Sequence, residues 1–434
     1  MIPLFLRKTF EDRGTWILPV TAFMMTSAIW FIVLGGARYL MSIPGENGLM
    51  YGTCAVLALL LLVIPMAALM SSAGRLMARQ RDRRLSTLRL LGASKSQLRA
   101  VSVAEASVLA SAGIALGVIL YLLLSPLVGL VHFNGDPIGA SGLWMGPGLL
   151  IVGILALLAL AVGSSLLGLS RVHITPLSVR SRTTPRRVRR TRLIVAVVVF
   201  LLAQVMIAAV GGLAGAFILI FLVLAMVVPL LGINFLGPLV LKWVATRQAK
   251  KARTAVTLIA ARNVLESPQE MWRQVGGVGF SIYLAVVAGS GMAMISAGSG
   301  PNARPEEVML NNDIQTGVIL ALVISFVMVA ASVSINQTAQ VLDRRELYVA
   351  LSRVGMSIAD QAQIRQLSVM RSLLTVMIIT VAIACVTAAP IVGGAMLMSP
   401  LTLLVILAVL LAGIGIVWVA TVATTPTLRR VVQA

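Results

Sequence analysis

The sequence predicts an all-α polytopic membrane protein of about ten transmembrane helices with a strongly basic cytoplasmic face. Three observations lead to this fold class. Of the 434 residues, 59% are hydrophobic and only 11% are charged, whereas soluble domains carry roughly 25% charged residues. The apolar runs reach the ~20 residues that a helix needs to cross the hydrocarbon. They also lack the alternating pattern of a membrane β-barrel, so a helical bundle is expected.

Polar segments divide the chain into ten apolar spans. The fifth and sixth are separated only by Gly211-Gly212, and joining them would leave nine spans and reverse the second half. The longest outer loop, Ser299–Asn312, is too short to fold as a domain. The predicted spans are residues 15–40, 50–74, 101–132, 146–170, 193–211, 213–241, 274–298, 314–338, 367–397 and 401–424.

The distribution of charge favours ten spans over nine. With a cytoplasmic N-terminus, 33 of the 35 basic residues fall on the inner side, and only Arg38 and Arg304 fall outside. The positive-inside rule is then satisfied in both halves, and both termini are predicted to be cytoplasmic. Topology and anionic lipid headgroups account for the net charge of +21, so no nucleic-acid partner is expected.

Two segments that precede spans three and nine are similar to each other. Leu91-Gly92-Ala93-Ser94 is followed by Gln97-Leu98-Arg99, and Val354-Gly355-Met356-Ser357 is followed by Gln363-Ile364-Arg365. An Arg-rich helix is predicted before each glycine. This internal repeat predicts three parts: a first half with spans 1–4 (residues 1–174), a basic linker with inserted spans 5–6 (175–258), and a second half with spans 7–10 (259–434).

The loop over residues 75–100 is predicted to hold a basic amphipathic helix. Its leucines recur at three-residue spacing among arginines. Gly92 suits the position after the helix end, and Ser94 suits the N-cap of the next helix. Such a helix either rests on lipid headgroups or docks a cytoplasmic partner. Its repetition favours docking, because a two-fold partner needs two equivalent contacts.

The Arg-rich helix, the Leu91–Ser94 motif, Gln97-Leu98-Arg99 and Glu105 together resemble the FtsX-like permease domain of type VII (MacB-like) ABC transporter membrane subunits. The resemblance covers about residues 50–175 and 310–430. The arrangement of four, two and four spans is similar to the bacitracin-export (BceB-like) branch, although the large extracellular domain of that branch is missing. The second copy also differs, since Arg371 stands where the first has Glu105.

This resemblance implies a bacterial plasma-membrane permease that works with a dimer of separate cytoplasmic ABC ATPases. The ATPases would bind ATP and Mg²⁺, and this chain would hold no cofactor. Glu105 is expected to form an ion pair at the membrane boundary, with Arg99 or Lys95 as its partner. The ATPase-docking residues are expected to be Arg81, Arg84, Leu88, Gly92 and Ser94 in the first half, and Arg344, Glu346, Leu351, Gly355 and Ser357 in the second.

No motif in the sequence indicates catalysis or metal binding. The P-loop pattern G-x-x-x-x-G-K-[ST] is missing, as are H-E-x-x-H and G-x-S-x-G. The two histidines, His132 and His173, fall on opposite predicted sides of the membrane. Seven arginines lie in Arg180–Arg192, which is interpreted as a flexible lipid-binding linker.

The expected function is ATP-driven export or extraction of an amphipathic substrate, a peptide, lipid or drug-like molecule, by mechanotransmission. An alternative is a non-transporting signal relay that passes ATPase motion to a small membrane or extracellular partner. A secondary transporter with parallel repeats would need paired ionisable or broken-helix sites at mid-bilayer, and the sequence shows no clear candidates. A sensor kinase encoded nearby would indicate resistance to antimicrobial peptides.

Overall fold

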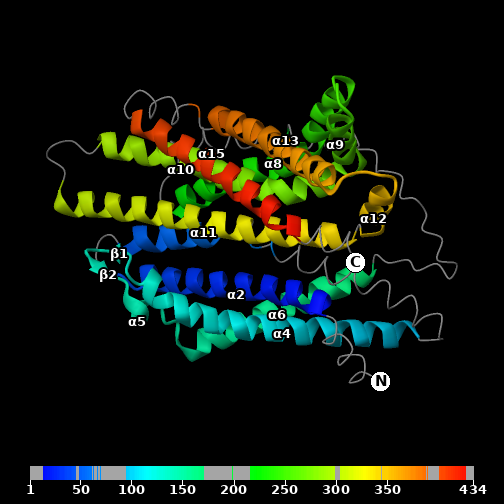
Figure 1. Ribbon diagram of the computed structural model, residues 1–434. Coiled ribbons are helices and arrows are strands. Elements are labelled where there is room, and N and C mark those ends of the chain that lie inside the picture. The colour runs from blue at the N-terminus through cyan, green and yellow to red at the C-terminus, as the bar shows by residue number, and fades with distance from the viewer. Residues whose placement is uncertain are drawn as a thin grey trace. The chain divides into compact units, whose positions relative to one another are not determined.

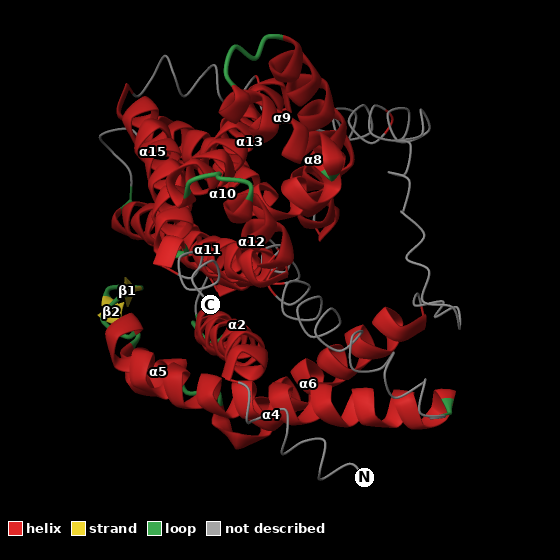
Figure 2. Cartoon of the chain, turned by 45° about the vertical axis from the view of Figure 1, so that its right-hand side comes forward, coloured by secondary structure: helices red, strands yellow, loops and turns green. Residues whose placement is uncertain are grey.

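The computed structural model divides the chain into two compact units. Unit 1 comprises Met1–Leu59 and Val63–Thr184, and unit 2 comprises Leu60–Leu62 and Pro185–Ala434. The structure describes residues 13–44, 48–60, 94–170, 216–298, 304–343, 345–387 and 400–426, with single positions at 62, 66, 69, 198 and 389. Helices dominate both units, and Figure 2 shows one small pair of strands.

The prediction of an all-α polytopic membrane protein is confirmed. Within the described residues, seven helices are long and apolar enough to cross a membrane, and the shorter apolar helices Gly48–Leu60 and Leu407–Ala423 accompany them. Every predicted span except the fifth overlaps one of these nine helices. The fifth span and the Gly211-Gly212 boundary lie outside the described residues, so the total of ten stays a prediction.

Unit 1 is built on the close packing of α2 (Arg13–Met41) against α4 (Lys95–Val128). Gly113 and Gly117 lie where the two helices approach each other. A Cβ added to Gly113 would lie 2.9 Å from the Val20 carbonyl oxygen, and one added to Gly117 would lie 2.7 Å from that of Met24. Small residues at four-residue spacing allow this approach of backbones. Helix α6 (Gly146–Ser170) also packs on α4.

A short hairpin and the helix α5 (Gly139–Leu143) connect α4 to α6. Strands β1 (His132–Phe133) and β2 (Asp136–Pro137) pair across Asn134-Gly135, both at positive φ as in a type I′ turn. The prediction that span three reaches residue 132 is therefore wrong: α4 ends at Val128. Two side chains fix this connection to the helices, since Tyr121 Oη donates to the Leu143 carbonyl (2.7 Å) and Arg38 Nη1 donates to that of Trp144.

Unit 2 surrounds α10 (Pro268–Gly298), which packs on α8 (Ala216–Lys250), α11 (Pro305–Asp343), α13 (Ile358–Thr387) and α15 (Pro400–Ala423). Two polar contacts join α10 to α11. Gln337 Nε2 donates to Gln274 Oε1 at 2.9 Å, and the hydroxyls of Ser281 and Ser325 lie 2.6 Å apart. Interhelical hydrogen bonds of this kind stabilise bundles in lipid. Helix α8, from the predicted inserted segment 175–258, thus packs within unit 2.

Several helices of unit 2 begin earlier than their apolar runs. Helix α11 starts at Pro305 and α13 at Ile358, whereas the spans were predicted to start at 314 and 367. The predicted loop Ser299–Asn312 is wrong from Pro305 onward. Proline suits the first helical position. The negative charges of Glu306 and Glu307 in the first turn interact favourably with the positive end of the helix dipole. Apolar runs mark the part of a helix that faces lipid, and hydrogen bonding continues into water.

Candidate docking site

The second predicted docking segment is a short helix between two long ones. Helix α12 (Arg345–Arg353) follows α11 and leads through a tight turn into α13, at the end of unit 2 remote from Pro305. The segment was predicted as one helix over Asp343–Arg353. Within the described residues, α11 ends at Asp343 and α12 begins at Arg345, and Arg344 between them lies outside the described set.

One face of α12 is packed against the neighbouring helices. The Tyr348 side chain joins Ile358 and Ala362 of α13 around the buried Val341 of α11. Gln361 is buried beside them, and its Nε2 donates to the carbonyls of Tyr348 (3.4 Å) and Met356 (3.3 Å). These contacts hold α12 on both α11 and α13.

Gly355 ends α12 in a Schellman motif. The Met356 amide donates to the Leu351 carbonyl, and the Gly355 amide donates to the Ser352 carbonyl, each at 3.0 Å. This pair of bonds is the pattern of that motif. Gly355 has φ of +96°, a left-handed conformation that costs L-residues with a Cβ roughly 1–2 kcal/mol. Glycine is therefore required here by the backbone.

Serine caps the helix that follows each of the two similar sequence motifs. The Asp360 amide donates to Ser357 Oγ (3.0 Å), and Ser357 Oγ donates to Asp360 Oδ2 (2.7 Å). At the start of α4, the Gln97 amide donates to Ser94 Oγ (3.2 Å), and the Ser94 amide donates to Gln97 Oε1 (2.9 Å). The prediction that Ser94 is an N-cap is confirmed. The two helix starts are therefore capped in a similar way, and the internal repeat stays a prediction.

Removing the Ser357 cap is expected to loosen the start of α13. An N-cap hydroxyl contributes about 1 kcal/mol, so hydrogen exchange of the Asp360 amide in S357A is expected to be about fivefold faster. Mass spectrometry of peptides spanning residues 345–365 measures this. The matched control is S357T, which keeps the hydroxyl and is expected to exchange at nearly the original rate. Unchanged exchange in S357A would show that the cap contributes nothing.

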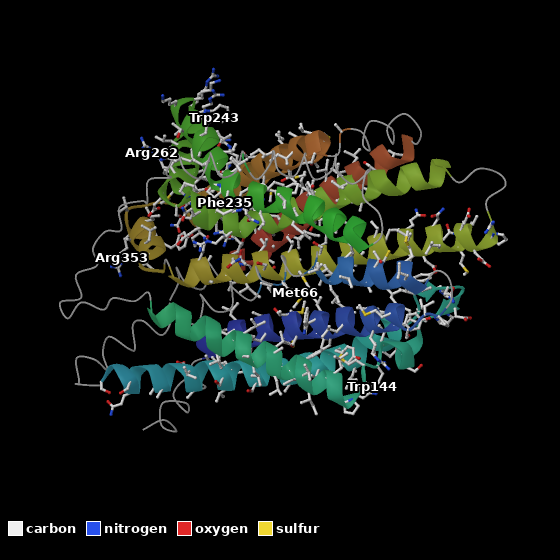
Figure 3. All side chains as sticks on the ribbon, turned by 180° about the vertical axis from the view of Figure 1, so that it is seen from behind. Met66, Trp144, Phe235, Trp243, Arg262 and Arg353 are labelled. Atoms are coloured by element: carbon white, nitrogen blue, oxygen red, sulfur yellow. The ribbon has the colours of Figure 1, made fainter. Side chains whose placement is uncertain are left out.

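The opposite face of α12 exposes apolar side chains beside a cation. Leu347 is 49% exposed and Val354 is 86% exposed, and the exposed Ala350 lies between them at helical spacing. Arg353 is exposed next to Val354 and extends from this end of unit 2 in Figure 3. We call Leu347, Ala350, Arg353 and Val354 the α12 face. An apolar stripe beside a cation on a firmly held helix is suited to contact a partner.

The structure describes the second predicted docking set only in part. Gly355 and Ser357 lie exposed in the turn after α12, and the Leu351 side chain is half-buried. Glu346 lies within α12, where its backbone alone is described. The sequence interpretation missed Leu347 and Val354, although their seven-residue spacing before Gly355 was a usable signal. Arg344 and most of the first set, Arg81, Arg84, Leu88 and Gly92, lie outside the described residues.

Two other predicted features are placed only in part. Glu105 lies half-buried in α4, but the Arg99 side chain is outside the described set, so their ion pair stays a prediction. His132 is exposed in β1, and His173 falls outside the described part of the chain. Among the residues that the structure describes, no group of three or more His, Cys, Asp or Glu is arranged to hold a metal ion.

A buried arginine links α13 to the end of α15. Arg365 is only 5% exposed, and its Nη2 donates to the Thr421 carbonyl at 2.8 Å. Arg365 corresponds to Arg99 in the predicted repeat, and no role was predicted for Arg365 from the sequence. Its position two turns into α13 connects the helix that carries the α12 turn to a third helix of the bundle.

The long apolar helices place the protein in the class of multi-pass helical membrane proteins. Residues 54–176, which include α4, α5 and α6, match the family described as FtsX-like permease C-terminal. The family consists of membrane subunits of ABC transporters. The match therefore supports an ABC transporter membrane subunit that associates with ABC ATPases. No curated protein matches the chain.

Proposed function

We propose that the protein is the permease subunit of an ABC transporter that couples ATP hydrolysis by separate cytoplasmic ATPases to export or extraction of an amphipathic substrate. The α12 face is the observation that carries the proposal. It presents Leu347 and Val354 to water at the end of unit 2 where Arg353 and Arg262 also lie (Figure 3). A basic end of a membrane protein faces the cytoplasm, where an ATPase could reach it.

Burial of these two side chains is large enough to support a specific contact. Full burial of a leucine or valine side chain stabilises by about 1.5–3 kcal/mol, and both are substantially exposed in the free chain. Contacts of this size at the centre of an interface are typical of residues that dominate binding.

The contacts behind α12 would carry motion from a partner into the membrane. Gln361 joins the α12 turn to α13 through two backbone carbonyls, and Arg365 joins α13 to α15. Helix α13 also packs along α10, the central helix of unit 2. A displacement of α12 would therefore move several packed helices together, because packed interiors transmit strain.

The proposal is tested by making the α12 face polar. The double variant L347S/V354S is expected to bind its ATPase at least tenfold more weakly, since it loses about 1.4 kcal/mol or more of apolar burial. The chain is co-expressed with the ABC ATPases of its own genome, and the purified complex is titrated. The matched control is V308S, an exposed apolar position near the other end of α11.

The control is expected to bind normally and to stimulate ATP hydrolysis as the unmodified chain does. Equal affinity of L347S/V354S and the unmodified chain for the ATPase would show that the α12 face is not the docking site. Substrate movement in proteoliposomes containing the complex and ATP then tests transport itself.

A further inference from the structure

Helices α8 and α9 (Ala255–Glu266) form a hairpin that stands out from unit 2 at the same end as α12 (Figure 1). Helix α8 has 35 residues and is therefore about 52 Å long at 1.5 Å per residue. The hydrocarbon layer is about 30 Å thick. A helix of this length reaches beyond the hydrocarbon at one end, and the cations Arg247 and Lys250 in its last turn favour the headgroup region for that end.

The hairpin is held in place on both of its arms. On α8, Asn234 Oδ1 accepts a hydrogen bond from Trp272 Nε1 of α10 at 3.1 Å, and Gly237 leaves the space that the Trp272 ring occupies. On α9, the Ala260 carbonyl accepts from Ser368 Oγ of α13 at 3.2 Å. The surface that the hairpin presents is therefore fixed by the bundle.

That surface is strongly basic. The chain carries no Asp or Glu from Lys242 to Arg262. All the cations of this stretch are exposed in the structure: Lys242, Arg247, Lys250, Lys251, Arg253 and Arg262. No other described part of unit 2 concentrates positive charge in this way.

Exposed apolar side chains lie among these cations. Trp243 is 54% exposed, and the Arg247 guanidinium lies 3.5 Å from its ring centroid. Leu258 and Ile259 are exposed on the outer face of α9, while Ala260, Ala261 and Val264 are buried on its inner face. Figure 3 shows Trp243 and Arg262 on the projecting hairpin.

This combination fits a lipid surface better than a protein or nucleic acid. Tryptophan is enriched at the membrane–water interface, and amphipathic helices bury an apolar face there while their cations attract anionic lipids. Apolar side chains on α9 would have no place on a nucleic-acid backbone. The charge also matches the negative potential of an anionic leaflet, to which each nearby Lys or Arg contributes about 1 kcal/mol.

We propose that the α8–α9 hairpin is a binding site for anionic phospholipid, with Arg247, Lys250 and Arg253 contacting headgroup phosphates and Trp243, Leu258 and Ile259 entering the acyl boundary. The site lies apart from the α12 face and does not depend on an ATPase partner. It would fix the basic end of unit 2 at the membrane surface.

The test uses the full chain in detergent, with lipids counted by native mass spectrometry after incubation with phosphatidylglycerol or phosphatidylcholine. Phosphatidylglycerol is expected to be retained in preference to phosphatidylcholine. In R247Q/K250Q/R253Q, phosphatidylglycerol affinity is expected to fall about a hundredfold, because three cations contribute about fivefold each. The charge-preserving variant R247K/K250R/R253K is expected to retain it. Excess inorganic phosphate is expected not to displace the lipid, since it lacks acyl chains.

A second triple variant controls for overall charge. R273Q/R304Q/R371Q removes the same charge from positions of unit 2 outside the hairpin and is expected to leave most phosphatidylglycerol bound. Equal loss in both triple variants would show diffuse charge attraction and overturn the site, as would displacement by inorganic phosphate. Unchanged affinity in R247Q/K250Q/R253Q would overturn it as well. W243A keeps the cations and is expected to weaken phosphatidylglycerol binding about tenfold. If the hairpin contacted only the headgroup phosphate, W243A would leave the affinity unchanged and would overturn the role of Trp243.

Discussion

The variant G355V is expected to reduce stimulation of ATP hydrolysis by the permease at least tenfold while leaving the chain inserted and folded. Valine cannot adopt φ of +96° without a left-handed strain of about 1–2 kcal/mol, and its β-branch raises that cost. Relief of the strain breaks the hydrogen bonds from Met356 and Gly355 that end α12. The α12 face would then lose its fixed orientation. A Cβ at Gly355 meets no described atom within 4 Å, so collision is not the cause.

Two further variants separate backbone strain from side-chain bulk. G355N is expected to be much milder than G355V, because asparagine tolerates the left-handed region. G289A, in α10, also places a Cβ in open space but on an ordinary helical backbone, and is expected to be neutral or slightly stabilising. ATPase rates are measured with reconstituted complexes at saturating ATP. Full stimulation by G355V would contradict the role of this turn in docking.

The variant G117V is expected to destabilise unit 1 by about 3 kcal/mol or more, the upper range for overpacked cores. A Cβ at Gly117 would overlap Ser27 Oγ and lie 2.7 Å from the Met24 carbonyl oxygen. The carbonyl belongs to the α2 backbone and cannot turn aside, so the two helices must separate. Loss of their contact would expose Ser27 and the buried Phe23. Thermal unfolding in detergent, followed by loss of monodisperse protein, measures the effect.

A compensating variant sharpens this test. G117A is expected to be milder than G117V, and G117A/S27A is expected to recover only part of the loss, because it removes the Ser27 hydroxyl but not the Met24 carbonyl. G148A, where a Cβ meets open space in α6, is expected to unfold like the unmodified chain. Normal stability of G117V would show that α2 and α4 do not pack through this glycine.

The sequence alone determined that the chain is a bundle of membrane helices. Lipid cannot satisfy backbone polar groups, so each long apolar run must be helical. It did not determine where the helices begin. Apolar runs report lipid contact, whereas α11 and α13 start where Pro305 and the Ser357 cap allow hydrogen bonding to begin. Asn134-Gly135 is a recognised hairpin-turn signal, which the assignment of residues up to 132 to the third span overlooked.

In the candidate docking segment, the sequence determined the helix boundaries, because each boundary depends on a single residue and its neighbours. The end of α12 follows from a glycine in a left-handed conformation, and the start of α13 follows from a serine N-cap. Both are local properties of the chain. The exposed face was decided by tertiary structure. Leu347 and Leu351 are both leucines and lie one helical turn apart, so the sequence allows either of them to face outward. Packing of Tyr348 against Val341, Ile358 and Ala362 turns Leu347 and Val354 to the outside, because burial depends on which helices lie alongside.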